Sequence, residues 1–367
     1  MAERGVRPQV PAVQQRALRA VRSLFTPLLP DDYLEMINPL WSTQELRGRI
    51  LRIEHETANA ATIVIKPGWR WRGHLPGQYL RIGVIVDGIH HWRAYSLTSD
   101  PDREDGCISI TPKLVDAGVV SPYLVRDAEP GVIVRLGGVE GTFTLPDPLP
   151  AASLFISAGS GITPIMSMLR ALDHRRALDD VVLIHSSRTP EDVIFGAQLR
   201  DMHRRNPGLR LLELHTTVRD RLEPADLDDL CPDWREREAF LSGPGDMLDA
   251  LVAHYEQAGG DTARLHMERF QPIVGRGDSE HGEGGAITLT KSGLQARSDG
   301  TQPILVAGEN AGATLPYGCR MGICHTCVGR LCSGRVRDLR TGEVLGQDGE
   351  MIRTCVHAPE GPVEIAL

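Results

Sequence analysis

Four cysteines near the end of this 367-residue chain have the residue type and the spacing to hold an iron–sulfur cluster. Cys319, Cys324 and Cys327 follow the pattern C-x4-C-x2-C, and Cys355 comes after another 27 residues. Each iron of a two-iron cluster takes two thiolates, so the four cysteines must converge on one loop region. The pattern therefore predicts a 2Fe-2S cluster and one-electron chemistry in the C-terminal part of the chain.

Other roles for the cysteines are weaker. Zinc sites usually pair two C-x2-C knuckles, whereas this segment contains one. A disulfide framework is disfavoured because the sequence shows no signal peptide. Cys332 is expected to pack within a strand over Val328–Val336, since four ligands already complete the cluster. Cys107 and Cys231 stand apart from the motif and are expected to be structural.

A second group, Arg93-Ala94-Tyr95-Ser96, has residue types suited to a flavin and is expected at the start of a strand. A guanidinium fork suits a diphosphate, and an aromatic wall suits a flat ring. The group resembles the R-x-Y-S/T motif of the ferredoxin–NADP reductase superfamily. This resemblance implies that Arg93 pairs with the flavin pyrophosphate, Tyr95 packs near the isoalloxazine and Ser96 hydrogen-bonds at N5. The alternative is that Arg93 forms a surface ion pair and Tyr95 belongs to the core.

The same family places a phosphate-binding turn after the next strand. Here Lys113 ends a predicted strand, and a Gly-x-x-Ser turn opens a short helix whose first N–H groups are free to meet phosphate. With this turn, the resemblance implies FAD rather than FMN. The predicted ligands in this segment are Lys113, Gly118, Val119, Val120 and Ser121.

A glycine-rich turn follows the apolar strand predicted for Ser153–Ala158 and precedes a helix predicted for Pro164–Leu172. Such a turn lets the backbone approach a pyrophosphate, and a helix N-terminus favours negative charge. The run AGSGITP at residues 158–164 also resembles the reductase superfamily, in which the threonine lies close to the flavin. The predicted nucleotide-binding residues are Gly159, Ser160, Gly161, Thr163 and Pro164.

The end of the next predicted strand bears on the choice between NADPH and NADH. In open α/β sheets this position faces the adenosine ribose, where an acid prefers a free 2′-hydroxyl and an arginine accommodates a 2′-phosphate. Ser187 and Arg188 stand there, so the sequence favours NADPH, with NADH as the alternative. The alternative is that Arg188 has no role in binding and forms an ion pair with Glu191 or Asp192 on the following helix.

Ser242 begins a Ser-Gly-Pro turn that matches a Cys-Gly-Pro turn near the nicotinamide in the superfamily. The serine puts in doubt a role for a thiol in hydride transfer, but it leaves the binding turn in place. The resemblance implies further cofactor contacts from Gly243, Pro244, Met247, Glu268 and Phe270. The predicted catalytic residues are Tyr95, Ser96 and Ser242.

These motifs need three folded domains to position them. Short strands punctuated by Pro-Gly pairs precede residue 149, and strands then alternate with helices, as in a parallel sheet covered on both faces. We expect a basic extension (residues 1–45), an antiparallel β-barrel that binds FAD (46–149), an α/β parallel-sheet domain that binds NAD(P) (150–270), a flexible linker (271–285) and an α+β β-grasp ferredoxin domain (286–367).

Composition narrows the class of partner. The net charge of −8 argues against nucleic-acid binding. The sequence contains no run of eighteen apolar residues, so it predicts no membrane span. Residues 1–26 carry several arginines on a basic amphipathic pattern. This segment either docks on a membrane surface or forms a helix or disordered arm beside the next domain. We expect a cytoplasmic protein, with peripheral attachment at the inner face of the plasma membrane under the first alternative.

Together the motifs predict an NAD(P)H oxidoreductase that passes single electrons from a flavin to the cluster. The domain order resembles reductase components of multicomponent oxygenases and desaturases. Residues 28–41 further resemble electron-transfer partners of acyl-CoA desaturases in actinobacteria, which implies a membrane-bound diiron desaturase in fatty acid metabolism as acceptor. An alkane, ring-hydroxylating or steroid oxygenase, served from NADH, is the alternative. A redox sensor is disfavoured because a sensor needs no hydride-donor site.

Overall fold

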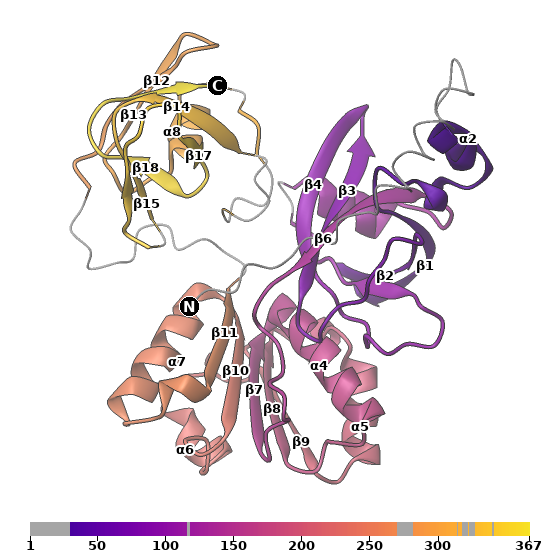
Figure 1. The fold of residues 1–367 in the computed structure, drawn as a ribbon. Coiled ribbons are helices and arrows are strands. Elements are labelled where there is room, and N and C mark those ends of the chain that lie inside the picture. The colour runs from indigo at the N-terminus through magenta and orange to yellow at the C-terminus, as the bar shows by residue number, and fades with distance from the viewer. Residues whose placement is uncertain are drawn as a thin grey trace.

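The computed structural model describes residues 30–115, 118–269, 282–313, 315–317, 322, 327–339 and 341–367. Three sheet-containing bodies follow one another along the chain (Figure 1). Residues 1–26, most of the predicted linker, Phe270, Cys319 and Cys324 lie outside the described residues. Within the described part, none of the helices has the length and apolar character needed to cross a membrane.

The first body is an antiparallel barrel. Its sheet has the order β4-β3-β6-β1-β2-β5, and the bridge between Leu97 and Ile110 joins the continuation of β4 to β5. Side chains such as Ile63 and Leu80 fill the interior. The strands are β1 (Arg47–Thr57), β2 (Ala60–Pro67), β3 (Tyr79–Val86), β4 (Ile89–Ser96), β5 (Ile108–Ile110) and β6 (Ile133–Glu140). The predicted barrel is thus confirmed.

One strand of this barrel differs from the sequence-based expectation. Arg93 to Ser96 lie at the end of β4, not at the start of a strand, and the first half of β4 was not predicted. That half reads Ile-His-His-Trp and lacks alternation of apolar and polar residues. The signal that was available is the pair Asp87-Gly88, whose positive φ angles of 51° and 77° form the tight turn between β3 and β4.

Short helices flank the barrel. The helix α2 (Pro30–Ile37) and the 3₁₀ turn η1 (Pro39–Trp41) precede β1. The helical turns α3 (Val120–Pro122) and η2 (Tyr123–Asp127) follow β5 and contribute Leu124 and Val125 to the barrel core.

The second body is a parallel sheet with helices on both faces, as predicted. Its order is β11-β10-β7-β8-β9. The strands are β7 (Ser153–Ala158), β8 (Val181–Ser187), β9 (Leu209–His215), β10 (Glu238–Gly243) and β11 (Leu265–Arg269). The helices and helical turns are η3 (Gly159–Gly161), α4 (Ile162–His174), η4 (Pro190–Asp192), α5 (Gly196–Arg205), α6 (Asp226–Leu230), α7 (Gly245–Gln257) and η5 (Thr262–Arg264).

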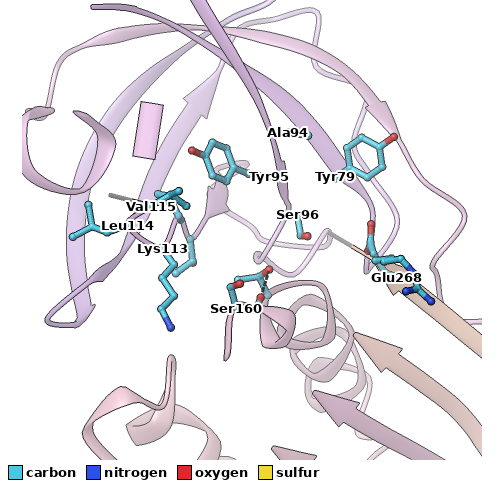
Figure 2. Close-up of a pocket in the computed structure, with 13 residues that line it drawn as sticks. Tyr79, Ala94, Tyr95, Ser96, Lys113, Leu114, Val115, Ser160 and Glu268 are labelled. Atoms are coloured by element: carbon cyan, nitrogen blue, oxygen red, sulfur yellow. Dashed lines mark hydrogen bonds between the residues drawn. The ribbon is translucent and has the colours of Figure 1, made fainter. Parts of the chain in front are cut away.

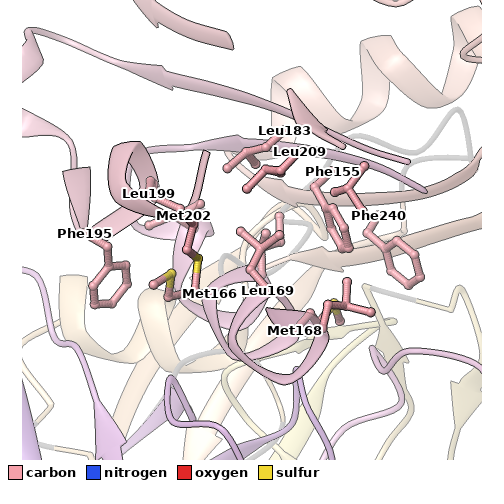
Figure 3. Close-up of a cluster of buried hydrophobic side chains, with 14 of the residues drawn as sticks. Phe155, Met166, Met168, Leu169, Leu183, Phe195, Leu199, Met202, Leu209 and Phe240 are labelled. Atoms are coloured by element: carbon pink, nitrogen blue, oxygen red, sulfur yellow. The ribbon is translucent and has the colours of Figure 1, made fainter. Parts of the chain in front are cut away.

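Alternation along the strands sends neighbouring side chains to opposite faces of this sheet. Phe155 packs with Phe240 and with α4 and α5 on one face, where their rings stack at 5.1 Å (Figure 3). Leu154 and Ile156 pack on the other face with residues of α6 and α7, such as Leu248. Burial on both faces explains why the central strands β7 and β8 are mostly apolar along their length.

The helix α4 also ties the second body to the barrel. Ser167 Oγ donates to Ser99 O at 2.7 Å, and Arg170 Nη1 donates to Thr98 O at 2.5 Å. Further along the helix, His174 Nδ1 lies 2.6 Å from Asp100 Oδ2. These contacts hold the loop after β4 against α4, so the cofactor motifs of the two bodies keep one relative position.

The third body has the predicted α+β character. A mixed sheet of order β13-β12-β19-β14-β17 packs against α8 (Ile304–Asn310), and a smaller sheet has the order β16-β15-β18. The strands are β12 (Gly285–Leu289), β13 (Leu294–Ser298), β14 (Val328–Ser333), β15 (Val336–Asp338), β16 (Val344–Leu345), β17 (Met351–Arg353), β18 (His357–Pro359) and β19 (Val363–Ala366). Where the sequence predicted one strand over 328–336, Gly334 at φ 93° separates two.

Two glycines at the end of the predicted linker pair with other segments of this third body. Gly284 pairs with Glu360, and Gly285 is the first residue of β12. A Cβ on Gly285 would lie 2.0 Å from the Gly361 carbonyl oxygen. Glycine is therefore required here by close backbone approach, although composition alone suggests flexibility.

Candidate functional site

A cavity of about 240 Å³ lies where the barrel meets the parallel-sheet domain (Figure 2). Three segments build it: the start of β3 and the end of β4 with the loop after β5, the turn η3 with the start of α4, and the end of β11. Predicted site residues that line the cavity are Tyr95, Ser96, Lys113, Ser160, Thr163 and Glu268. An apolar hollow with a few converging polar groups is the usual form of a cofactor site.

Pairing of β4 with β3 places the barrel side of the cavity. Tyr95 lies opposite Leu80, and Ser96 lies opposite Tyr79, whose ring also lines the cavity. Burial raises the pKa of the Tyr95 phenol, so this ring stays neutral. A neutral aromatic wall of this kind fits the flat ring of a flavin.

Arg93 lies two residues before Tyr95, on the same face of β4. Its Nη1 donates to the Trp92 carbonyl oxygen at 2.8 Å. Across the described residues no carboxylate forms an ion pair with Arg93, which weakens the alternative that it serves only as a surface ion pair. Tyr95 packs at the edge of the barrel core and also lines the cavity. A place in the core and a role in the cavity are therefore compatible for this residue.

The predicted phosphate turn stands outside the lining of the cavity. The Ser121 hydroxyl accepts a hydrogen bond from Val115 N at 3.2 Å, and Val120 is buried in the barrel core. Gly118 and Val119 are half-buried beside them. Lys113 is the member of this predicted group that reaches the cavity.

Close packing shapes the glycine-rich turn. A Cβ on Gly161 would lie 2.1 Å from the Ser242 carbonyl oxygen, and Gly159 has a φ of 55°. Thr163 Oγ1 donates to Ser160 O at 2.9 Å and closes the turn. Pro164 lies in the first turn of α4, where the missing N–H has no intrahelical acceptor to lose.

The Ser-Gly-Pro turn packs directly against the glycine-rich turn. Ser242 is fully buried at the end of β10, and its Oγ has no hydrogen-bond partner among the described residues. Ser242 does not line the cavity, in contrast to the other two predicted catalytic residues. A Cβ on Gly243 would meet Met247 Cε at 2.8 Å, and Pro244 precedes the first residue of α7.

The predicted 2′-phosphate residues lie at the carboxyl end of β8. Ser187 Oγ donates to Thr189 O at 2.9 Å and lies 3.0 Å from His215 Nδ1 on β9. Arg188 is exposed, and within the described part of the chain it forms no ion pair with Glu191 or Asp192. Sequence reasoning missed His215, although the end of the neighbouring parallel strand was the place to look.

Glu268 is the most perturbed acid of the cavity. Burial raises the pKa of its carboxyl from 4.5 to about 8, and its Oε2 has no hydrogen-bond partner among the described residues. The register of the sheet places it beside Ser242, and Figure 2 shows its carboxyl below Tyr79. A proton therefore resides on Glu268 at neutral pH, next to the space that the cavity residues enclose.

Two of the four predicted cluster ligands are described, and both are buried in the third body: Cys327 and Cys355. Gly322 N donates to Cys355 Sγ at 3.2 Å, and Arg353 Nη1 donates to Gly322 O at 2.9 Å. Backbone N–H donors to sulfur stabilise the thiolates that ligate iron, so this pair fits a cluster. Cys332 lies on β14 as a strand residue, as expected.

Family models of three domains match the chain. The oxidoreductase FAD-binding domain matches residues 67–145, the oxidoreductase NAD-binding domain matches residues 155–233, and the 2Fe-2S iron-sulfur cluster binding domain matches residues 287–360. Their order along the chain is the order of the three bodies in the structure.

Relatives match over most of their lengths. A protein of Mycobacterium tuberculosis named NADPH oxidoreductase is 46% identical over 349 residues, which cover 94% of this chain and 90% of the relative. The stachydrine N-demethylase reductase subunit Stc4 of Rhizobium meliloti is 29% identical, covering 87% of this chain and 95% of its own. Among solved structures, phthalate dioxygenase reductase has a TM-score of 0.58 at 21% identity, covering 88% of this chain and 98% of its own, so it supports the fold.

We expect Glu268 to make stability depend on pH. Between pH 4.5 and about 8 the folded chain keeps a proton on this carboxyl that the unfolded chain has lost, so the free energy of unfolding falls as pH rises through this window. In Glu268→Gln this part of the decline should disappear. Denaturant unfolding across the window measures it, with the exposed Glu256→Gln as control. An unchanged decline in Glu268→Gln would show that the carboxyl is not protonated in the folded chain.

Proposed function

Because this chain belongs to the NAD(P)H oxidoreductases that combine an FAD-binding, an NAD-binding and a 2Fe-2S domain, we propose that it serves a membrane-bound diiron fatty acyl-CoA desaturase as electron donor. It binds FAD, NAD(P)H and a 2Fe-2S cluster. When bound, the flavin accepts a hydride as an electron pair and the cluster accepts single electrons. The meeting of three segments at one cavity supports the reductase part of the proposal, because it brings motifs from both nucleotide-binding domains together.

The residues around the cavity act by placing groups and holding charge. Tyr95 walls the flavin ring and Ser96 presents a hydroxyl at its reactive edge. Arg93 binds the diphosphate with its guanidinium fork. Glu268 holds the proton that must move when electrons leave singly, since its raised pKa near 8 lets it gain or lose a proton close to neutral pH. Ser242 acts from beneath, by supporting the turn that contains Gly161.

NADPH is the proposed hydride donor. The support is an exposed arginine without an ion-pair partner in the described residues, next to Ser187 and His215 at the carboxyl end of β8. A guanidinium and an imidazole on neighbouring strands suit a 2′-phosphate. The name of the mycobacterial relative agrees with this choice.

The acceptor is the finer part of the proposal. A desaturase rests on the likeness of residues 28–41 to partners of such enzymes, and on the exposed apolar residues Met36 and Ile37 of α2. The basic segment 1–26 would then approach the membrane surface. An oxygenase is the second candidate, because two relatives are named as reductases of a demethylase and of 3-ketosteroid-9-alpha-monooxygenase, the latter from Mycolicibacterium smegmatis at 30% identity.

Arg93→Ala should lose FAD during purification or bind it roughly tenfold or more weakly, because the diphosphate loses a charged donor. Arg93→Lys should recover part of the affinity, since an ammonium keeps the charge without the fork. Flavin content per chain and FAD titration measure both. Arg52→Ala on the exposed face of β1 serves as control. Wild-type flavin affinity in Arg93→Ala would refute the assigned role.

Arg188→Ala should lower kcat/KM for NADPH by roughly tenfold to a hundredfold and leave NADH unchanged, since one charge-assisted contact to the 2′-phosphate is lost. Ferricyanide reduction measures kcat/KM for NADPH and for NADH, and it does not require the natural acceptor of the cluster domain. Arg204→Ala, exposed on α5, is the control. Equal losses with both dinucleotides would assign Arg188 to a general role instead.

Reconstitution tests the acceptor. Purified chain, NADPH and membranes containing an acyl-CoA desaturase should yield unsaturated acyl-CoA, and a soluble ring-hydroxylating oxygenase component should yield little product. Removal of residues 1–26 should lower turnover with membranes and spare ferricyanide reduction. Efficient turnover with the oxygenase, and none with the desaturase, would replace the first candidate with the second.

A further inference from the structure

We propose that Tyr317 docks the cluster domain on the flavin site by packing its ring against the guanidinium of Arg93. The Arg93 Cζ lies 5.4 Å from the centroid of the Tyr317 ring. Arg93 belongs to β4 of the barrel, and Tyr317 precedes the cluster motif of the third body. The contact therefore joins two domains at the residue that the proposed function assigns to the FAD diphosphate, and the inference rests on that assignment.

Both residues lie close in sequence to a residue predicted to contact a redox cofactor. Tyr317 precedes Cys319, the first cysteine of the cluster motif, by two residues. Arg93 precedes Tyr95 by two residues, so both point to one face of β4. In Figure 1 the label of β4 lies toward the third body.

The geometry of a guanidinium lets one arginine hold both partners. Its N–H groups donate in the plane, while its flat face stacks on an aromatic ring. Arg93 directs Nη1 to the Trp92 carbonyl oxygen at 2.8 Å, and the Tyr317 ring takes up a position over the group. A diphosphate held by the in-plane N–H groups would therefore leave the face of the guanidinium open to the Tyr317 ring.

The contact bears on electron transfer between the two cofactors. In this step one electron passes from reduced FAD to the oxidised cluster, so the flavin loses one electron and the cluster gains one. The proton released from the flavin passes to water, because Glu268 already carries a proton at neutral pH. No covalent bond to the protein forms or breaks. Tyr317 acts as a positioning residue, because it determines how often the cluster domain is docked on the barrel.

Loss of the Tyr317 ring should lower the rate of cluster reduction. It should leave the earlier step, reduction of the flavin by NADPH, unchanged. An exposed cation–π contact changes the docked fraction roughly twofold to fivefold, and the rate follows that fraction. Tyr317→Phe keeps the ring and is the matched control. Tyr317→Ala and Tyr317→Leu remove it while leaving the cysteines in place.

The test is anaerobic rapid mixing of the full-length holoprotein with NADPH. Flavin absorbance reports hydride transfer, and cluster absorbance with freeze-quench EPR reports the later step. Iron and sulfide content normalises each variant, because Tyr317 adjoins the cluster motif. We expect flavin reduction and FAD content as in the wild type for all variants, slower cluster reduction in Tyr317→Ala and Tyr317→Leu, and wild-type cluster reduction in Tyr317→Phe.

Other outcomes overturn the proposal. Unchanged cluster reduction in Tyr317→Ala would show that the contact does not control the step, and equal losses in Tyr317→Phe would assign the effect to the hydroxyl. If cluster assembly fails without the ring, amide exchange of β4 in the cluster-free proteins decides: exchange unaltered from the wild type would refute docking, and faster exchange at Arg93 would support it. Failure of the Arg93 assignment is separate, since it appears as wild-type FAD affinity in Arg93→Ala.

Discussion

The close approach of the glycine-rich turn to β10 is the constraint on which the cofactor site depends. With no side chain at Gly161, the turn rests on the Ser242 carbonyl oxygen, and any Cβ there would lie 2.1 Å from that atom. This contact determines where α4 begins, and α4 in turn is hydrogen-bonded to the loop after β4 through Ser167 and Arg170. The positions of the barrel and of the parallel sheet relative to the cavity therefore depend on this backbone contact together with the hydrogen bonds of α4.

Burial then gives the cavity its electrostatic character. Glu268 and Ser242 lie side by side on neighbouring strands, and each has a polar atom without a partner in the described residues. Desolvation keeps the carboxyl protonated at neutral pH, whereas an exposed glutamate would be ionised. Unpartnered buried polar atoms are costly to folding, so their presence beside a cofactor cavity is typical of a site organised for chemistry rather than stability.

The described part of the electron path runs through three bodies with different kinds of contact. Several hydrogen bonds connect α4 with the barrel, whereas the contact of Arg93 with Tyr317 is a packing of a charge on a ring. Hydrogen bonds to backbone carbonyls fix an orientation, while a cation–π contact tolerates displacement and is weaker. Such a difference suits a chain in which the cluster must meet a flavin within the molecule and an acceptor outside it.

The sequence by itself determined the chemistry of this protein, because that chemistry depends on short motifs. The cysteine spacing, the AGSGITP run and the alternation of strands and helices are local in the chain, so they predicted the three domains and their cofactors. The first half of β4 was not predicted because its Ile-His-His-Trp run does not alternate between apolar and polar residues. The Asp87-Gly88 pair was an available signal for the hairpin turn.

Tertiary structure alone decided which motif residues meet. It excluded Ser242 from the cavity lining, brought His215 beside Ser187, buried Glu268 and set Tyr317 on Arg93. Each of these depends on residues from strands or domains far apart in sequence. Burial, strand register and contact between domains are sums over the whole fold, and no local pattern of residues encodes them.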